Sequence, residues 1–259
     1  MERGGLSRIA AVASNTFRET VRERVLYNLV FFAILMTLAG LLLGELSIRQ
    51  DEKVIKDIGL AAIELFGIGI ALFIGVGLVS KEIERRSLYP LLAKPLTRAE
   101  FYLGKFAGLA FTLFVNVTVM TLGVYATLLA TGRGADPRLL SAILPIYLGL
   151  LLVVALAMLL SSITSSMLAT VGTIGLVLAG RYSDVIRNAR EVAPGTPRWL
   201  LDVLYYSLPN FRNFDFKSRV AYGDPVPVEA LLWVGLYAVL YIGAALSLGM
   251  AAFRSRDFQ

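Results

Sequence analysis

Residues 81–105 read KEIERRSLYPLLAKPLTRAEFYLGK, a polar stretch between two apolar runs that are each long enough to cross a membrane. The stretch contains six basic residues: Lys81, Arg85, Arg86, Lys94, Arg98 and Lys105. Pro90 and Pro95 both interrupt helical hydrogen bonding. The pattern therefore predicts a short helix over residues 82–89, a bend at Pro90, and a second turn leading into the next apolar run. We expect this element to lie flat on the cytoplasmic face of a membrane.

The composition is that of an integral membrane protein. Hydrophobic residues make up 57% of the 259 positions, and the mean hydropathy is +0.70. The net charge of +6 comes from basic residues that flank apolar runs. This placement favours topology signals and contacts with anionic lipid headgroups over binding of nucleic acid. The chain has no cysteine and no histidine, which excludes disulfides, thiolate or imidazole catalysis, and metal sites built from those ligands.

The fold class predicted from the apolar runs is an all-α membrane protein with six transmembrane helices. The expected spans are residues 25–44, 58–80, 102–131, 139–161, 166–180 and 228–253. The fifth run is marginal in length, so it either recruits neighbouring serines or ends as a broken helix shielded by protein. Residues 25–259 are expected to form one transmembrane permease domain, with a cytoplasmic loop at residues 81–101.

Residues 1–24 are predicted to form a separate N-terminal element. Within residues 7–24, apolar positions recur three or four apart at Ile9, Val12, Ala13, Phe17 and Val21. Such a basic amphipathic helix should lie in the membrane interface with its apolar stripe in lipid; a solvated tail is the alternative. No cleavable signal peptide is indicated, because the first apolar run starts near residue 25 and no small-residue cleavage site follows it.

The longest segment between spans covers residues 181–227 and is expected to be extracytoplasmic. Its residues 199–206 are rich in aromatic side chains, which predicts a short helix lying at the outer surface. When this long segment is discounted, the remaining loops and ends place thirteen basic residues on the side of the termini and five on the other. Both termini are therefore predicted to be cytoplasmic.

Two polar side chains within the spans are candidates for lining a transport pathway, Glu64 and Asn116. A carboxylate within a span costs on the order of 2–3 kcal/mol, so Glu64 should face either water and headgroups near the outer interface or a pathway. Asn116, with the threonines of the third span, is expected to form interhelical hydrogen bonds. A pathway-lining role is the alternative for Asn116.

Three stretches together identify a resemblance. The first is the order Glu82, Ser87, Leu88, Leu91, Leu92, Pro95, Arg98, Gly104 and Lys105; the second is LPNFRNF at residues 208–214; the third is FRSRDF at residues 253–258. From about residue 15 to its end, the chain closely resembles ABC exporter permeases of the second type. The resemblance implies that the loop after the second span forms a coupling helix, which docks into a groove on a separate ATPase subunit. It also implies extracytoplasmic helices between the last two spans.

The resemblance also implies roles for residues of the loop. We expect a packed surface formed by Ile83, Leu88, Tyr89, Leu91 and Leu92. Polar contacts are expected from Glu82, Arg85 and Arg86, and Glu82 and Pro95 match positions of the family pattern. The family often has Gly-Thr after the acidic segment, where this chain has Arg86 and Ser87, so the resemblance does not extend to the local helix geometry. The alternative for the loop is a positively charged anchor that binds only lipid.

Motifs for catalysis are missing from the chain. It contains no G-x-x-x-x-G-K-[ST], H-E-x-x-H or G-x-S-x-G. We therefore expect a non-catalytic subunit that needs no cofactor or metal of its own, with ATP and magnesium bound by the partner. Six spans are half of the usual twelve-span exporter pathway, so the resemblance implies two permease chains, either identical or similar, and two ATPase subunits in a cell membrane.

The sequence thus predicts the permease subunit of an ATP-driven exporter and gives no indication of its substrate. A mechanical subunit is the first alternative, using the same ATPase to act on an extracytoplasmic accessory protein through residues 181–227. An ATP-independent secondary transporter is the second alternative. Such a transporter usually has more charges within its spans and an internal two-half repeat, and this sequence has neither feature.

Overall fold

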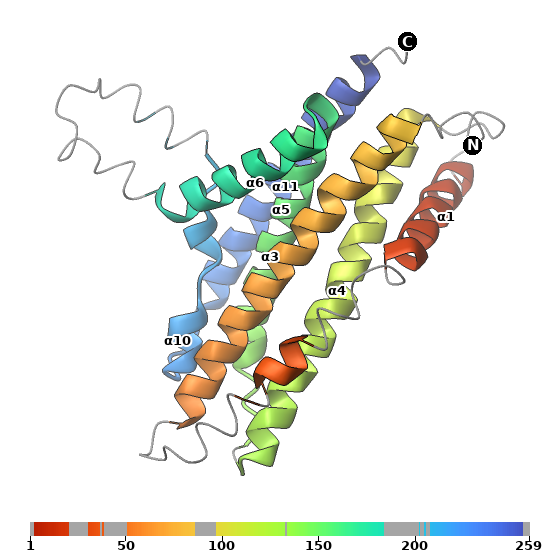
Figure 1. Cartoon of the computed structure of the whole chain (residues 1–259). Helices are drawn as coiled ribbons and strands as arrows, with labels where there is room; N and C mark the ends of the chain where they lie inside the picture. Colours follow the sequence, from red (N-terminus) through yellow and green to blue (C-terminus); the bar gives the residue numbers. More distant parts are fainter. Residues whose placement is uncertain are drawn as a thin grey trace.

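The computed structural model describes residues 3–20, 31–36, 38, 51–85, 97–132, 134–183, 202, 205 and 208–255. The regular elements of these residues are all helices, as the sequence predicts (Figure 1). They are α1 (Arg3–Thr20), α3 (Asp51–Arg85), α4 (Arg98–Ala130), α5 (Leu139–Ile163), α6 (Ser166–Arg181), the 3-10 helix η3 (Phe211–Phe214), α10 (Lys217–Ala221) and α11 (Val228–Ser255).

Among the residues that the structure describes, four helices are long and apolar enough to cross a membrane, over Glu52–Gly77, Arg98–Ala130, Leu139–Ile163 and Val228–Phe253. They correspond to the second, third, fourth and sixth predicted spans. The fifth is a shorter apolar helix of 16 residues, α6, which extends about 24 Å and is shorter than a typical hydrocarbon core of about 30 Å. Most of the first predicted span lies outside the described residues; its residues 31–36 and 38 are helical.

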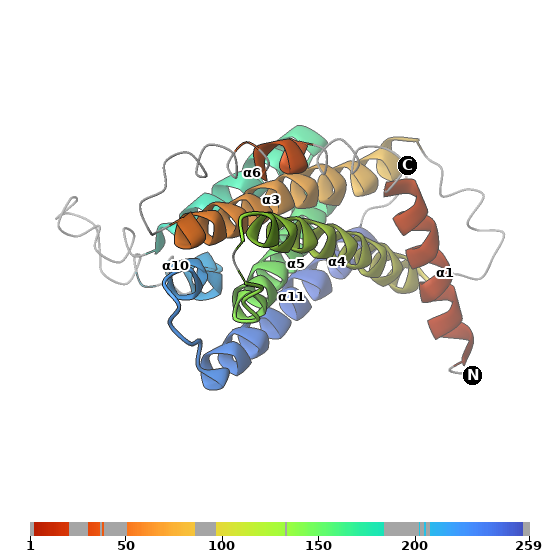
Figure 2. The same ribbon diagram turned by 90° about the horizontal axis from the view of Figure 1, so that it is seen from below.

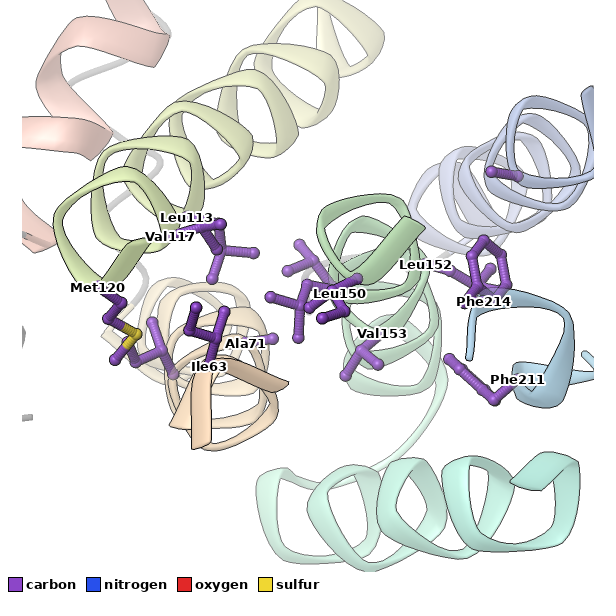
Figure 3. Packing of buried hydrophobic residues seen from close by; sticks show 14 of the residues in the cluster. Ile63, Ala71, Leu113, Val117, Met120, Leu150, Leu152, Val153, Phe211 and Phe214 are labelled. Carbon is purple, nitrogen blue, oxygen red and sulfur yellow. The ribbon is translucent and has the colours of Figure 1, made fainter. Parts of the chain in front are cut away.

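Helix α5 lies in the middle of the bundle and packs against α3, α4, α6 and α11 (Figure 2). It is apolar on all sides, and 61% of its most apolar window is buried, against 22% for α11. Its side chains point toward different neighbours: Leu150 lies toward Ala71 of α3, whereas Leu152 lies toward Phe214 of η3 (Figure 3). The core is therefore built around α5.

The two ends of the bundle differ in what they hold (Figure 1). At one end lie α1, the last turn of α3, the first turns of α4 and the end of α11; we name this the α1 end. At the opposite end lie the start of α3, α10 and the turn between α4 and α5; we name this the turn end.

The helix boundaries around the polar stretch differ from the prediction. Helix α3 continues without a break to Arg85, although a new short helix was expected to begin at residue 82. The reason is local: residues 81–85 (KEIER) are mostly good helix formers, and no proline occurs before Pro90. Helix α4 begins at Arg98, four residues earlier than expected, because Thr97 caps it.

Helix α1 packs against α4 with the stripe that was expected to face lipid. A Cβ atom placed on Gly104 would lie 2.7 Å from Val12 Cβ, and one placed on Gly108 would lie 2.7 Å from Thr16 Cβ. The rings of Phe17 and Phe111 meet edge to face, with centroids 4.8 Å apart. The glycines let the two backbones approach closely, so protein replaces lipid as the partner of this stripe.

Residues 208–221, which we name the inserted segment, pack against the bundle with part of their side chains, while others, such as Arg212 and Arg219, are exposed. Phe211, Phe214, Val220 and Ala221 are all buried, and the first three belong to the main hydrophobic core. The structure shows that this segment packs against α3, α5 and α6; that residues 181–227 are extracytoplasmic stays a prediction. The aromatic helix predicted at residues 199–206 lies outside the described residues except at positions 202 and 205, which are helical.

Candidate functional site

The structure describes both flanks of the predicted coupling element but not its centre. Glu82, Ile83 and Arg85 belong to the last turns of α3, whose side chains at these positions are outside the description. Six further predicted residues lie outside the described residues: Arg86, Leu88, Tyr89, Leu91, Leu92 and Pro95. Their roles remain predictions. The structure describes the end of α3, which precedes this stretch, and the start of α4, which follows it.

The helix that follows the polar stretch, α4, begins with a capping box. The Thr97 hydroxyl accepts a hydrogen bond from the Glu100 N–H at 3.2 Å, and the Thr97 N–H donates to Glu100 Oε2 at 2.8 Å. These reciprocal bonds satisfy two N–H groups that a helix start would otherwise leave unpaired. Arg8 of α1 lies 3.8 Å from the same carboxylate. The direction of α4 is thus fixed within one turn of the polar stretch.

The first turns of α4 are also held by α11, on a side distinct from α1. Phe253 stacks on Phe101 with ring centroids 6.5 Å apart and lies 6.0 Å from the ring of Tyr102. The Arg98 guanidinium donates to the Phe253 carbonyl at 3.4 Å. Lys105, only 3% exposed, places its Nζ 5.5 Å from the centroid of the Phe101 ring. Together α1, α4 and α11 form one packed unit at the α1 end.

Gly249 makes a very close contact within this unit and provides a prediction. A Cβ atom there would lie 2.1 Å from the hydroxyl of Tyr102, a ring that is 2% exposed and has little room to move. We expect Gly249→Ala to lower the free energy of unfolding by about 1–3 kcal/mol through overpacking. The matched control is Gly243→Ala on the same helix, where a Cβ meets nothing within 4 Å. Thermal unfolding in detergent measures both variants, and equal stability of the two would contradict the prediction.

Glu64 is the centre of a group of four charged side chains that we name the ion cluster: Glu64, Arg181, Asp215 and Lys217. The Glu64 carboxylate receives hydrogen bonds from the Arg181 guanidinium and the Lys217 ammonium. Arg181 Nη2 also lies 3.3 Å from Asp215 Oδ2, and Lys217 Nζ lies 3.7 Å from Asp215 Oδ1. Two positive and two negative charges therefore neutralise each other, and they join α3, the end of α6 and the inserted segment.

Sequence reasoning singled out Glu64 but missed its partners. They lie 117 and 153 residues away in the chain, at Arg181 and Lys217, and no local pattern links positions so far apart. The carboxylate is 19% exposed and bound to protein cations. In the structure, the Glu64 carboxylate therefore faces protein side chains. Its role in a pathway remains a prediction.

Asn116 and the threonines of α4 form hydrogen bonds within their own helix. The prediction was that they bond to neighbouring helices. The Asn116 amide donates to the Thr112 carbonyl at 2.8 Å, and the Thr112 hydroxyl donates to the Gly108 carbonyl at 2.9 Å. Thr118 and Thr121 likewise donate to the carbonyl four residues earlier. Asn116 is 1% exposed, and its Oδ1 has no hydrogen-bond partner among the described residues. In this structure it faces the protein core, and its pathway-lining role is untested.

A second set of polar contacts closes the turn end. Lys56 of α3, 4% exposed, bonds to Asp136 at 2.7 Å and to Glu52 at 2.6 Å. Asp136 lies in the turn between α4 and α5. The Arg138 side chain of the same turn donates to the Gly223 carbonyl at 2.7 Å, just after α10. These contacts fix the start of α3, the turn between α4 and α5, and the residues just after α10 relative to one another.

The Asp136 contact predicts a pH dependence of stability. Burial alone would raise the pKa of Asp136, but hydrogen bonds from Lys56 and from the Arg138 N–H outweigh it and hold the pKa below its usual value. The stabilisation is therefore present above about pH 4, near the pKa of an unfolded Asp, and is lost as the pH falls through the lowered folded value. We expect wild type to be more stable than Asp136→Asn at pH 7 and the difference to shrink below about pH 4. A difference that stays constant down to about pH 3 would contradict this account.

The fold defines a class: a multi-pass helical membrane protein with a polar stretch of sequence between two long helices and a capped helix start after it. A family model described as "ABC-2 family transporter protein" matches residues 10–181. The chain therefore belongs to the ABC-2 transporter family. The matched region includes α3, the polar stretch, α4, α5 and α6. No curated protein sequence matches the chain.

Proposed function

We propose that this chain is the permease subunit of an ATP-driven ABC exporter and that a separate ATPase subunit hydrolyses the ATP. Family membership supports a permease. The observation that carries the coupling part of the proposal is the structure around residues 86–96. A continuous helix of 35 residues, α3, leads into this stretch, and the capped start of α4 leads out of it.

Such an arrangement suits the transmission of rigid-body motion. A displacement of the loop would move the long helix α3 along its whole length, because no proline interrupts it between Asp51 and Arg85. The same displacement would move α4 together with α1 and α11, because all three pack as one unit at the α1 end. Packed helices shift between discrete arrangements and do not deform gradually. When an ATPase closes on the loop, the resulting movement would in this way be transmitted to α3 and to α4 with α11, the helices that pack on different sides of α5.

We further propose how the chain is oriented in the membrane and what it assembles with. The α1 end faces the cytoplasm of the cell, where the ATPase lies, and the turn end faces outward. Two copies of the chain, or one copy with a similar permease, share a pathway, and each contacts one ATPase that binds ATP and magnesium. Within the loop, Leu88, Leu91 and Leu92 supply the apolar contact, and Glu82 and Arg86 supply polar contacts. The same contact surface on the ATPase side also includes Ile83, Arg85, Tyr89 and Pro95.

Affinity purification of the chain from its native membrane tests the proposal. In mild detergent, we expect a soluble protein with a G-x-x-x-x-G-K-[ST] loop to copurify and to be identified by mass spectrometry. A Leu88→Arg variant should reach the membrane at wild-type levels but lose most of this partner. The matched control is Leu140→Arg at the turn end, where the wild-type side chain is 57% exposed. Absence of any such ATPase, even after cross-linking through the loop lysines, would overturn the proposed function.

A further inference from the structure

A groove of about 550 Å³ lies between α11 and the inserted segment. Its volume is within the range of pockets that hold small organic ligands, about 300–1,000 Å³. Three polar residues line the groove from the inserted segment, Arg212, Asn213 and Asp215, and its lining on α11 is apolar or aromatic, from Ala230 to Leu240. The groove therefore has one polar wall and one apolar wall, which suits an amphiphilic molecule.

The apolar wall follows a membrane-spanning helix. The lining positions of α11 recur three or four residues apart, so they form one stripe along this helix. Between Ala230 and Leu240 the stripe extends about 15 Å, which is half of a hydrocarbon core of about 30 Å. It begins two residues after Val228, where α11 starts at the turn end. The apolar wall therefore matches the depth of one leaflet, the leaflet at the turn end.

The side chains of the apolar wall are suited to contact with hydrocarbon. Val234 is buried at the base of the wall, whereas Trp233 and Leu240 are 71% and 63% exposed. The Tyr237 hydroxyl accepts a hydrogen bond from the Asn210 N–H at 2.7 Å, so its polar atom is already bonded within the protein. Apolar side chains at membrane depth contact acyl chains, and an indole ring is typical of the membrane interface.

The charge on the polar wall favours an anionic headgroup. The Asp215 carboxylate contacts Arg181 and Lys217 of the ion cluster, at 3.3 and 3.7 Å, so its charge is already balanced there and does not offset that of Arg212. The Arg212 side chain is exposed, and a guanidinium binds phosphate through two parallel N–H groups. Asn213, which is also exposed, adds an amide donor. The polar wall thus combines two side chains that donate hydrogen bonds to phosphate oxygens.

We propose that this groove binds one phospholipid with an anionic headgroup, from the leaflet at the turn end. The headgroup phosphate contacts Arg212 and Asn213, and one acyl chain lies along Trp233, Leu236 and Leu240. The bound lipid in this way joins the inserted segment to α11. The inference goes beyond the proposed function and does not depend on it, because the site lies at the opposite end of the bundle from the loop that would contact an ATPase.

Quenching of tryptophan fluorescence by brominated lipids tests the proposal. The chain has two tryptophans, so the full-length variant Trp199→Phe keeps Trp233, on the apolar wall, as the only one. It is placed in phosphatidylcholine vesicles with a small share of brominated phosphatidylglycerol or, in a second sample, with the same share of brominated phosphatidylcholine. We expect phosphatidylglycerol to bind beside Trp233 about fivefold more tightly, the effect of one basic residue near a membrane surface.

Two arginine variants, each added to Trp199→Phe, identify the cause of this preference. Arg212→Gln should lower the preference to about onefold, because the cation on the polar wall is removed. The matched control is Arg219→Gln, which removes the same charge from an exposed position of the inserted segment outside the groove. Equal quenching by the two brominated lipids in the parent variant would overturn the proposal. An equal loss of preference in the two arginine variants would also overturn it.

Analysis of copurified lipid tests the apolar wall. The chain is purified in mild detergent, and the anionic phospholipid retained with it is measured by mass spectrometry. Trp233→Ala should lower the retained amount at least about twofold. Leu232→Ala should leave it unchanged, because Leu232 is 69% exposed on the same helix but lies outside the groove. Equal retention in the two variants would contradict an acyl chain along this wall.

Inorganic phosphate distinguishes a lipid from a free anion in the groove. Excess phosphate should displace no more phosphatidylglycerol from the Trp233 site than sodium chloride of the same ionic strength, because phosphate has no acyl chain to occupy the apolar wall. Selective displacement by phosphate would show that the groove binds an anion alone, and it would overturn the assignment to a lipid.

Discussion

Replacing Glu64 with glutamine is expected to lower the free energy of unfolding by about 2–4 kcal/mol. The substitution keeps the shape of the side chain but removes the negative charge between Arg181 and Lys217. Asp215 would then be the remaining anion for two cations, and Lys217, which is 8% exposed, would keep only its longer contact with Asp215, at 3.7 Å. Thermal unfolding of the purified chain in detergent would measure the loss.

A second substitution separates this electrostatic cause from a loss of packing. In the double variant Glu64→Gln/Lys217→Met, the charges of Arg181 and Asp215 still balance, so most of the lost stability should return. A double-mutant cycle measures the coupling between the two positions. If the double variant is destabilised by the sum of its two single changes, the account of the ion cluster is wrong.

Replacing Gly180 with alanine is expected to cost about 3 kcal/mol or more, the upper end of the usual range for overpacking. A Cβ atom on Gly180 would lie 2.0 Å from the backbone oxygen of Pro209 and 2.8 Å from Phe211 Cδ2. Backbone cannot rotate away as a flexible side chain can, so α6 and the inserted segment must separate. Arg181, the next residue, would be carried away from Glu64.

Gly175→Ala on the same helix is the matched control for Gly180→Ala. A Cβ at Gly175 meets nothing within 4 Å, and the higher helix propensity of alanine should stabilise the helix by up to about 1 kcal/mol. Unfolding and hydrogen exchange of residues 208–221 measure both variants. Equal protection of the inserted segment in the two variants would contradict a tight contact between Gly180 and Pro209.

The sequence predicted helices where their cause is local. Runs of apolar residues located the ends of α4, α5 and α11 within four residues and those of α3 within seven, because crossing hydrocarbon requires length and apolarity that can be counted. The start of α4 could have been placed more closely, since Thr97 and Glu100 form the S/T-x-x-E pattern of a capping box. Helix propensity explains why α3 extends to Arg85. The prediction of a break near residue 81 did not take this propensity into account.

The parts that the sequence did not predict depend on contacts between distant residues. The pairing of α1 with α4 requires that Val12 and Gly104 lie at matching heights, and periodicity alone cannot distinguish a protein partner from lipid. The inserted segment contains charges and aromatic residues, which are equally typical of a surface loop. Its buried side chains are held by the hydrogen bond from Lys217 to Glu64 and by the packing of Phe214 on Gly149. Neither contact corresponds to a pattern in the sequence.

Site-specific photo-cross-linking tests the central claim most directly, which is that the loop between α3 and α4 receives the ATPase. A photoreactive amino acid would replace Leu88 in one variant and Tyr222 in another; Tyr222 is 68% exposed at the turn end. The account predicts an adduct between the ATPase and position 88 and none at position 222. An ATPase that copurifies but reacts only at position 222, or at neither position, would contradict the proposed orientation and coupling.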